Sequence, residues 1–262
     1  MTVPALSIVF PCFNEAGRLP GTLERYLAAF PEDPAAVEFV VVDDGSTDAT
    51  AAIAEKTAAG DPRVRLLRSD FNHGKGFAVR AGVLSAEGEL VVFTDADGSY
   101  DPVQVKRVVR ALDGASVAIG SRAGGPLEVD PSATPPGEPP EEGPGMALRR
   151  TASRVFNTAM RLTLGLDYQD TQCGLKGFRR EEARELFGRA RLEGFAFDAE
   201  ILFLARRLGY EVAEVRVRPT DQDGSKVRLA VDALRMLREV WAVRRAAARG
   251  LYDQARVRDH AG

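Results

Sequence analysis

Short apolar runs alternate with longer segments of mixed character through the first 120 residues of the chain. The runs are rich in Val, Ile, Leu and Phe and lie at residues 6–10, 38–42, 64–67, 90–93 and 115–120. Continuous apolar runs of this length predict strands that are buried on both faces. The intervening segments predict helices at residues 19–30, 49–59, 72–86 and 103–112. Because strand and helix alternate, the sequence predicts an α/β fold with a single Rossmann-like, mostly parallel central sheet flanked by helices.

The second half of the chain has a less regular pattern. Residues 123–145 are rich in Pro, Gly and Glu and show no period, which predicts a long flexible loop, either a lid or a surface insertion. Helices are expected near residues 147–164, 181–187 and 194–208, and an alternating segment at 211–217 predicts a strand.

The last predicted helix, residues 227–249, is amphipathic and basic. From Lys226 onward the chain has nine Lys or Arg residues against four Asp or Glu residues, together with Trp241. Such a helix fits an anionic membrane surface, and it equally fits a helix that packs on the sheet with a solvated basic face. Both interpretations can hold along its length.

Polar side chains follow the predicted strands at their carboxyl ends, where ligands bind in open α/β sheets. These side chains are Asn14, Glu15, Asp43, Asp44, Asp70, Asp95 and Asp97. Asp95 and Asp97 follow an apolar strand one residue apart, and paired carboxylates suit Mg²⁺ or Mn²⁺ bound together with substrate phosphates. An ordinary turn would explain the same two residues less well, because the other strands also end in polar groups.

The segment Asn72-His73-Gly74-Lys75-Gly76 begins a predicted helix. Two glycines around a lysine allow phosphate to approach the backbone closely, with Lys75 as a point charge, and a glycine-rich turn with a solvated lysine is the alternative. The chain contains neither the glycine fingerprint of a dinucleotide fold after the first strand nor a Walker A motif.

Composition removes several functional classes. The net charge of −3 argues against a general nucleic-acid binder. The two cysteines, Cys12 and Cys173, provide no disulfide framework and suit a reducing compartment. No basic leader or apolar run of membrane-spanning length is visible, so we expect a cytoplasmic protein, peripheral at the cytoplasmic face of a membrane.

Taken together, these motifs resemble the family 2 glycosyltransferases of GT-A fold. The resemblance rests on SIVFP with Asn14-Glu15, on VDDGSTD at residues 42–48, on residues 72–76 and on Asp95-Ala96-Asp97. In the second half, DTQCGLK at 170–176, FDAE at 197–200 and Gly224-Ser225-Lys226 resemble polyprenyl-phosphate sugar synthases, and the first two are most similar to dolichyl-phosphate β-glucosyltransferases. The resemblance implies a glycosyltransferase domain at residues 1–226, followed by the basic helix and tail at 227–262.

The resemblance also implies roles for individual residues. It assigns nucleotide binding to Pro11, Asn14, Glu15, Asp43, Asp70, Lys75 and Asp95. The divalent metal, Mg²⁺ or Mn²⁺, falls on Asp95 and Asp97. Acceptor phosphate binding falls on Arg122, Arg149, Arg150, Gln172, Ser225 and Lys226. The catalytic set falls on Asp97, Arg122, Arg149, Asp198 and Glu200. Ser99 departs from the related mannosyl synthases, which have Gln at that place.

The implied reaction is inverting, metal-dependent transfer of a hexose from a nucleotide sugar, UDP-glucose first, to a polyprenyl or dolichyl-type lipid phosphate. A phosphomonoester with a second pKa of about 6 is largely dianionic near neutral pH, so it needs little help from a general base. The alternatives are a GDP-mannose donor, a hydroxyl acceptor that requires Asp198 or Glu200 as base, and a non-catalytic nucleotide-sugar-binding protein. A homodimer stays an open alternative.

Overall fold

The computed structural model describes residues 3–30, 33, 36–122, 158, 160–220 and 229–253, with side chains described from residue 238 onward in the last helix. Within these residues, seven strands form one sheet in the order β3-β2-β1-β4-β6-β5-β7. The strands are β1 Leu6–Cys12, β2 Val37–Asp44, β3 Val64–Ser69, β4 Leu90–Thr94, β5 Val117–Ser121, β6 Leu175–Arg179 and β7 Val212–Arg216. The predicted α/β fold with a mostly parallel central sheet is confirmed.

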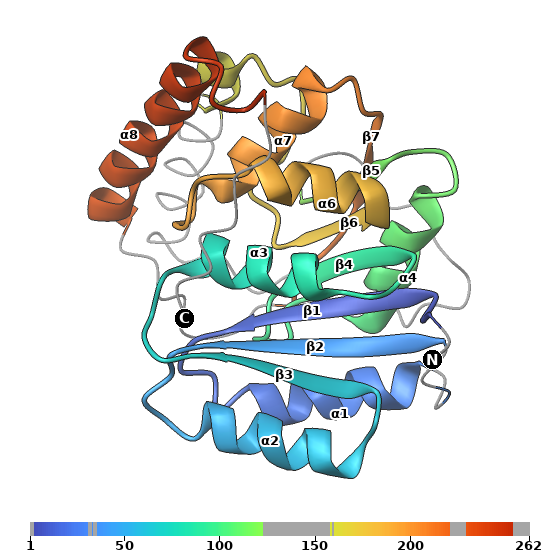
Figure 1. The fold of residues 1–262 in the computed structure, drawn as a ribbon. Coiled ribbons are helices and arrows are strands. Elements are labelled where there is room, and N and C mark those ends of the chain that lie inside the picture. Colours follow the sequence, from blue (N-terminus) through green and yellow to red (C-terminus); the bar gives the residue numbers. More distant parts are fainter. Residues whose placement is uncertain are drawn as a thin grey trace, which may run out of the picture.

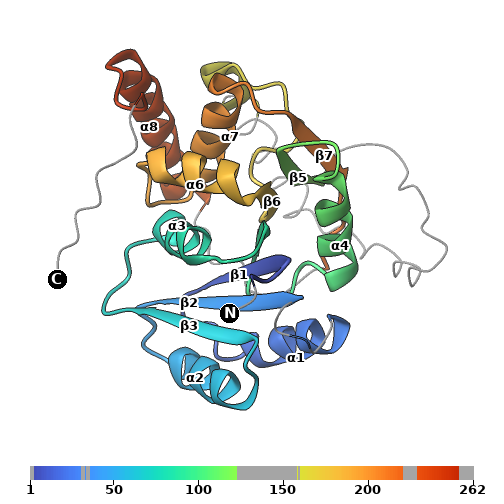
Figure 2. The ribbon, with the colours of Figure 1, turned by 45° about the vertical axis from the view of Figure 1, so that its right-hand side comes forward.

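Helices cover both faces of the sheet. Their bounds are α1 Leu19–Ala29, α2 Thr50–Gly60, α3 Lys75–Ser85, α4 Pro102–Ala111, α6 Arg180–Arg189, α7 Phe197–Arg207 and α8 Leu229–Ala248. In Figure 1, α1 and α2 lie below β1–β3, whereas α3, α6, α7 and α8 lie above. Figure 2 shows the same two layers after rotation.

Alternate residues of each central strand enter two separate apolar cores. Val9, Val40 and Phe93 pack with α3, α6 and α7, and Val240 and Val243 of α8 belong to the same core. Their strand neighbours face α1, α2 and α4 on the other side. Burial on both faces explains why these strands read as continuous apolar runs rather than alternating ones.

Strand β6 breaks the parallel pattern. It pairs antiparallel with both β4 and β5 and thereby separates two strands that are close in sequence. From the sequence, residues 167–180 show no clear amphipathic period and predict only a loop that enters a short strand. The inserted strand places residues 170–176 directly beside the end of β4, and this placement shapes the site described below.

The C-terminal helix packs on the core. Val240 and Val243 are buried, whereas Trp241 is 59% exposed, so the helix both packs and presents an outer face. No helix among the described residues is long and apolar enough to cross a membrane. The predicted boundary at residues 226–227 and the predicted loop at 123–145 lie outside the described residues.

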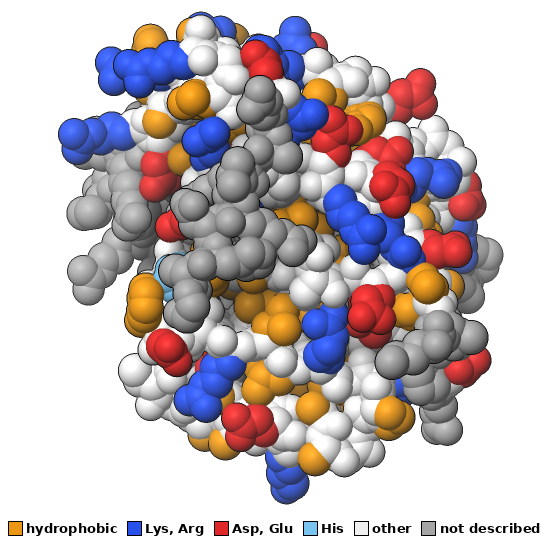
Figure 3. Space-filling model, in the orientation of Figure 1, with side chains coloured by type: hydrophobic (Ala, Val, Ile, Leu, Met, Phe, Trp, Pro, Cys, Tyr) orange, Lys and Arg blue, Asp and Glu red, His pale blue; other side chains and the backbone are white. Residues whose placement is uncertain are grey.

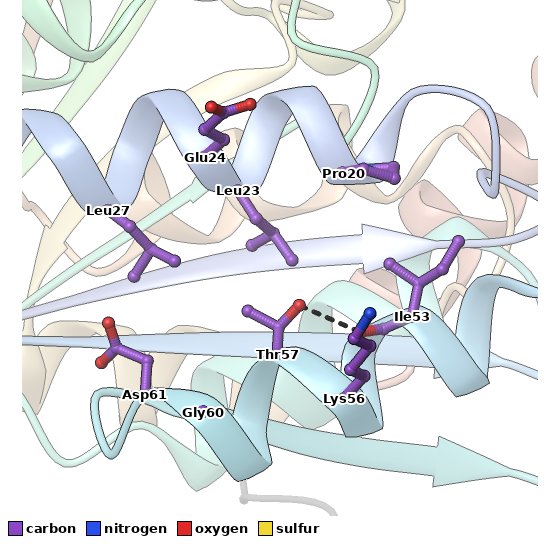
Figure 4. A pocket seen from close by; sticks show the side chains of 9 residues that line it. All are labelled: Pro20, Leu23, Glu24, Leu27, Ile53, Lys56, Thr57, Gly60 and Asp61. Carbon is purple, nitrogen blue, oxygen red and sulfur yellow. Dashed lines mark hydrogen bonds between the residues drawn. The ribbon is translucent and has the colours of Figure 1, made fainter.

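A groove of about 620 Å³ runs between α1 and α2, on the lower layer in Figure 1. Figure 4 shows Leu23 and Leu27 of α1 facing Ile53 and Thr57 of α2. None of the predicted site residues lines this groove.

Candidate active site

A second pocket, of about 710 Å³, lies at the carboxyl ends of β1, β2 and β4. Six predicted site residues line it, namely Pro11, Glu15, Lys75, Asp95, Asp97 and Arg122. Further lining groups come from the same strand ends and from the segments that carry Tyr100, Phe195 and Thr220. The strand-end polar groups thus meet in one cavity, as expected for an open α/β sheet.

Asp95 and Asp97 lie in the turn that follows β4, and helix α1 holds this turn in place. Thr22 donates to the carbonyl of Ala96 at 3.0 Å, and Arg25 donates to the carbonyl of Gly98 at 3.1 Å. Gly98 has φ +75, a conformation that favours glycine. The turn therefore presents two half-buried carboxylates to the pocket.

These two carboxylates fit a divalent cation. Gly174 lies against Asp95, and a Cβ at Gly174 would be 2.0 Å from Asp95 Oδ2, so only glycine leaves room for the carboxylate. In the described part of the chain, no group of three or more acidic, histidine or cysteine side chains is arranged to hold a metal. Two carboxylates completed by diphosphate and water oxygens are a common arrangement for Mg²⁺.

Lys75 is the cation next to the paired carboxylates, and its Nζ lies 2.6 Å from Asp95 Oδ1. Burial lowers the pKa of Lys75, but the carboxylates of Asp95, Asp198 and Asp97 together raise this pKa by more, so the net shift is upward. Lys75 therefore stays protonated near the pocket, and the alternative of a solvated lysine is wrong.

Gly76, directly after Lys75, is enclosed by a neighbouring segment. The N–H groups of Gly76 and Phe77 donate to the carbonyl of Glu193, at 2.8 and 3.3 Å. A Cβ at Gly76 would be 2.8 Å from the carbonyl of Leu192. A neighbouring segment therefore already occupies these two amides, whereas Gly74 lines the pocket, and the close approach of phosphate to this segment stays a prediction.

Three residues predicted to hold the nucleoside do not line the pocket. Asn14, at φ 54, accepts hydrogen bonds from the Thr47 and Asp48 amides and so joins the loops after β1 and β2. Asp43 is fully buried, and its Oδ2 has no hydrogen-bond partner. Asp70 is exposed. Their nucleotide roles stay predictions. Asp43 Oδ2 lies 3.7 Å from Arg68 Nε, an ion pair longer than a hydrogen bond, and Asp43 Oδ1 accepts from the N–H of Ser46.

Arg122 forms a two-point ion pair with Asp170. Its Nε and Nη2 donate to Asp170 at 2.6 and 3.0 Å, and its backbone N–H donates to Asp170 at 3.1 Å. Burial raises the pKa of Asp170, but the Arg122 guanidinium lowers it more. A fixed guanidinium at the pocket wall suits an anionic ligand.

Asp198 lies under the pocket rather than in its lining. It is 4% exposed, and its Oδ1 accepts from the Nζ of fully buried Lys176 at 2.6 Å. Lys176 also donates to the carbonyl of Cys173 at 2.7 Å. Burial raises the pKa of Asp198, and the nearby Lys176 and Lys75 only partly offset it.

Glu200 is fully buried and also lies outside the lining. It accepts from the N–H groups of Arg191 and Leu192 and from the hydroxyl of Tyr252. The catalytic roles of Asp198 and Glu200 stay predictions that their positions do not favour. Gln172 is half-buried and outside the lining, and its N–H donates to Asp170. Arg149, Arg150, Ser225 and Lys226 lie outside the described residues.

Two groups that the structure places at the site carry only weak signals in the sequence. Asp44 lines the pocket and accepts from the N–H groups of His73 and Gly74. Arg18 lines the pocket and forms a two-point ion pair with Glu15 at 2.6 Å. Asp44 was among the polar groups at the strand ends but received no specific role, whereas Arg18 lacked any motif of its own.

Comparison with known proteins agrees with this geometry. Residues 7–187 match glycosyl transferase family 2. The dolichyl-phosphate beta-glucosyltransferase of Drosophila melanogaster is 37% identical over 91% of this chain and 74% of its own length. The human dolichyl-phosphate beta-glucosyltransferase is 33% identical over 85% of this chain and 69% of its own length.

Solved structures support the fold. Glucosyl-3-phosphoglycerate synthase from Mycobacterium tuberculosis, crystallised with Mn²⁺ and UDP, aligns with TM-score 0.62 and 22% identity over 91% of this chain and 78% of that chain. Mannosyl-3-phosphoglycerate synthase from Rubrobacter xylanophilus aligns with TM-score 0.63 and 20% identity over 98% of this chain and 78% of that chain. Together with the matched residues and the paired carboxylates at the end of β4, these likenesses show that the chain has a GT-A fold, belongs to glycosyl transferase family 2 and is a glycosyltransferase.

Proposed function

We propose that this glycosyltransferase moves glucose from UDP-glucose to the phosphate of a polyprenyl or dolichyl-type lipid, with inversion at the anomeric carbon. The relatives named above support the sugar and the acceptor. The UDP and Mn²⁺ bound by a structural neighbour agree with the donor and metal that the family resemblance implies.

One observation carries the choice of a phosphate acceptor. Asp198 and Glu200, the two candidates for a general base, lie outside the pocket lining and are bonded to other protein groups. A hydroxyl acceptor requires such a base, whereas a phosphate dianion with its second pKa near about 6 does not. Arg122, already fixed by Asp170, suits the acceptor phosphate.

The residues of the pocket divide the work between donor and acceptor. Asp95 and Asp97 would hold Mg²⁺ or Mn²⁺, and the ion would supply charge neutralisation for the departing diphosphate. Lys75 adds a second positive charge on the same side. Arg122 orients the acceptor oxygen for direct displacement, so an α-linked donor gives a β-linked product.

The decisive experiment measures transfer of radiolabelled sugar to a short polyprenyl phosphate from UDP-glucose and from GDP-mannose, with Mn²⁺ or with EDTA. We expect metal-dependent β-glucosyl lipid, and Asp97→Ala should abolish it. Formation of mannosyl lipid would show that the donor is GDP-mannose and not UDP-glucose. An α-linked product would refute the single-displacement mechanism. Metal-dependent hydrolysis of the donor without any lipid product would refute the proposal that the acceptor is a lipid phosphate.

A lipid acceptor requires access to a membrane, and we propose that the outer face of α8 supplies it at the cytoplasmic face. Arg238, Trp241, Arg245 and Arg249 are all exposed, and at 100° per residue they fall within an arc of about 80° opposite Val240 and Val243. Figure 3 shows Lys and Arg side chains gathered at the upper left, where Figure 1 places α8.

An exposed Trp among arginines suits an anionic lipid surface. We expect the protein to sediment with anionic vesicles, and Trp241→Ala and Arg245→Ala should each weaken this binding several-fold. Arg110→Ala, on the exposed side of α4, is the matched control. Equal binding to neutral and anionic vesicles would contradict the charge argument.

A further inference from the structure

The buried carboxylate of Glu200 organises the segment that precedes α7. It accepts from the N–H groups of Arg191 at 3.0 Å and Leu192 at 2.8 Å. Its third donor is the hydroxyl of Tyr252, at 2.5 Å, in the turn after α8. Three donors on one buried carboxylate fix the backbone at residues 191–192.

The fixed segment in turn supports the first turn of α3. The carbonyl of Glu193 accepts from the N–H groups of Gly76 and Phe77. The fit is close, because a Cβ at Gly74 would be 2.5 Å from that carbonyl oxygen. A shift of residues 191–193 would therefore move the start of α3.

The start of α3 carries Lys75, whose Nζ lies 2.6 Å from Asp95. A continuous series of contacts thus joins Tyr252 and Glu200 to Lys75 through residues 191–193. The turn after α8 is itself anchored, because Arg189 donates to the carbonyl of Tyr252 at 2.7 Å and Arg191 donates to that of Leu251 at 2.8 Å.

We propose that Glu200 is a positioning residue, which sets the place of Lys75 at the donor diphosphate through residues 191–193. The proposal rests on the donor site of the proposed function. This positioning role differs from that of a general base, because the carboxylate acts through hydrogen bonds that it accepts and not by removing a proton.

The test measures UDP and uridine binding to the full chain by calorimetry with Mn²⁺. Glu200→Leu removes all three acceptor contacts, so UDP affinity should fall about tenfold, the range of one hydrogen bond to a charged group. Uridine lacks the diphosphate, so its affinity should change by less than about twofold. Glu200→Gln keeps an acceptor for the backbone donors, and UDP affinity should stay within about threefold of wild type.

A double-mutant cycle with Lys75→Met shows whether Glu200 acts through Lys75. In the Lys75→Met background, Glu200→Leu should cause no further loss of UDP affinity, because the group that it positions is gone. Tyr252→Phe removes a single donor and leaves the core filled, so it provides a second, milder variant. We expect it to weaken UDP about threefold and to leave uridine unchanged.

Several outcomes would overturn the inference. Additive losses in the cycle, or an equal loss of uridine affinity, would show that Glu200 only stabilises the fold. Loss of turnover in Glu200→Gln with wild-type UDP affinity would show a base. Absence of UDP binding by the wild-type protein would instead refute the proposed donor, and the inference with it.

Discussion

Gly174→Ala is the sharpest perturbation of the paired-carboxylate site. The new Cβ would lie 2.0 Å from Asp95 Oδ2 and 2.7 Å from Asp95 Cγ. Since contacts to Cβ below about 3 Å do not occur in folded proteins, the carboxylate must move by at least about 1 Å. A displacement of about 1 Å in a reacting group costs on the order of 100-fold in rate.

The structure predicts which quantities change. Lys176 holds the carbonyl of Cys173 beside Gly174, so the backbone cannot easily retreat and Asp95 has to move. We expect kcat/KM to fall about 100-fold and Mn²⁺ affinity to fall measurably, with a loss of unfolding free energy of at most about 3 kcal/mol. Mn²⁺ binding by electron paramagnetic resonance and urea unfolding measure these changes independently of turnover.

The matched control is Gly188→Ala in α6, where a new Cβ meets nothing within 4 Å. It should leave activity and Mn²⁺ affinity unchanged and raise stability slightly, because alanine is the better helix former. If Gly174→Ala kept wild-type Mn²⁺ affinity and activity, the assignment of Asp95 to the metal would be wrong.

Two other predictions concern ion pairs. Asp61→Asn should destabilise the protein by about 1–2 kcal/mol at pH 7, because Arg63 is 5% exposed and would lose its carboxylate partner while keeping the carbonyls of Leu27 and Phe30. Hydrogen bonds from Arg63 lower the pKa of Asp61. The ion pair therefore stabilises the folded state fully above the ordinary pKa of 3.8, and this stabilisation is lost as the pH falls through the lower pKa of the folded state. Urea unfolding across pH should show the stabilities of wild type and Asp61→Asn converging in acid. Arg122→Lys should lower kcat/KM for the lipid phosphate about tenfold, because lysine cannot make the two-point contact with Asp170. Arg110→Lys is its control, and equal effects of the two would contradict a role for Arg122.

Much of the fold was predictable because the relevant information is local. A strand buried on both faces needs a continuous apolar run, and the five runs of the first half all became strands. The rule that ligands bind at strand carboxyl ends then placed Asp95 and Asp97 in the pocket. The family resemblance, which rests on these same motifs, is confirmed by the matched residues.

The part that the sequence did not predict depends on contacts between distant segments. Strand β6 has no apolar period, because Lys176 is its second residue and pairs with Asp198 from another element. The insertion of β6 between β4 and β5 brings Gly174 to Asp95, a contact over 79 positions that no local pattern encodes. The need for glycine there is visible only in three dimensions.

The carboxylates of α7 show why a motif can be noticed in the sequence without its structural partners being predictable. Asp198 and Glu200 lie in the first turn of the helix, where an acidic residue can favour the helix dipole, act as a base or pair with a buried group. The structure gives each a specific partner, Lys176 for Asp198 and residues 191–192 with Tyr252 for Glu200. Since both partners come from segments that the helix meets only after folding, the two residues support the site from beneath, and the pocket itself is left to groups that suit phosphate and metal.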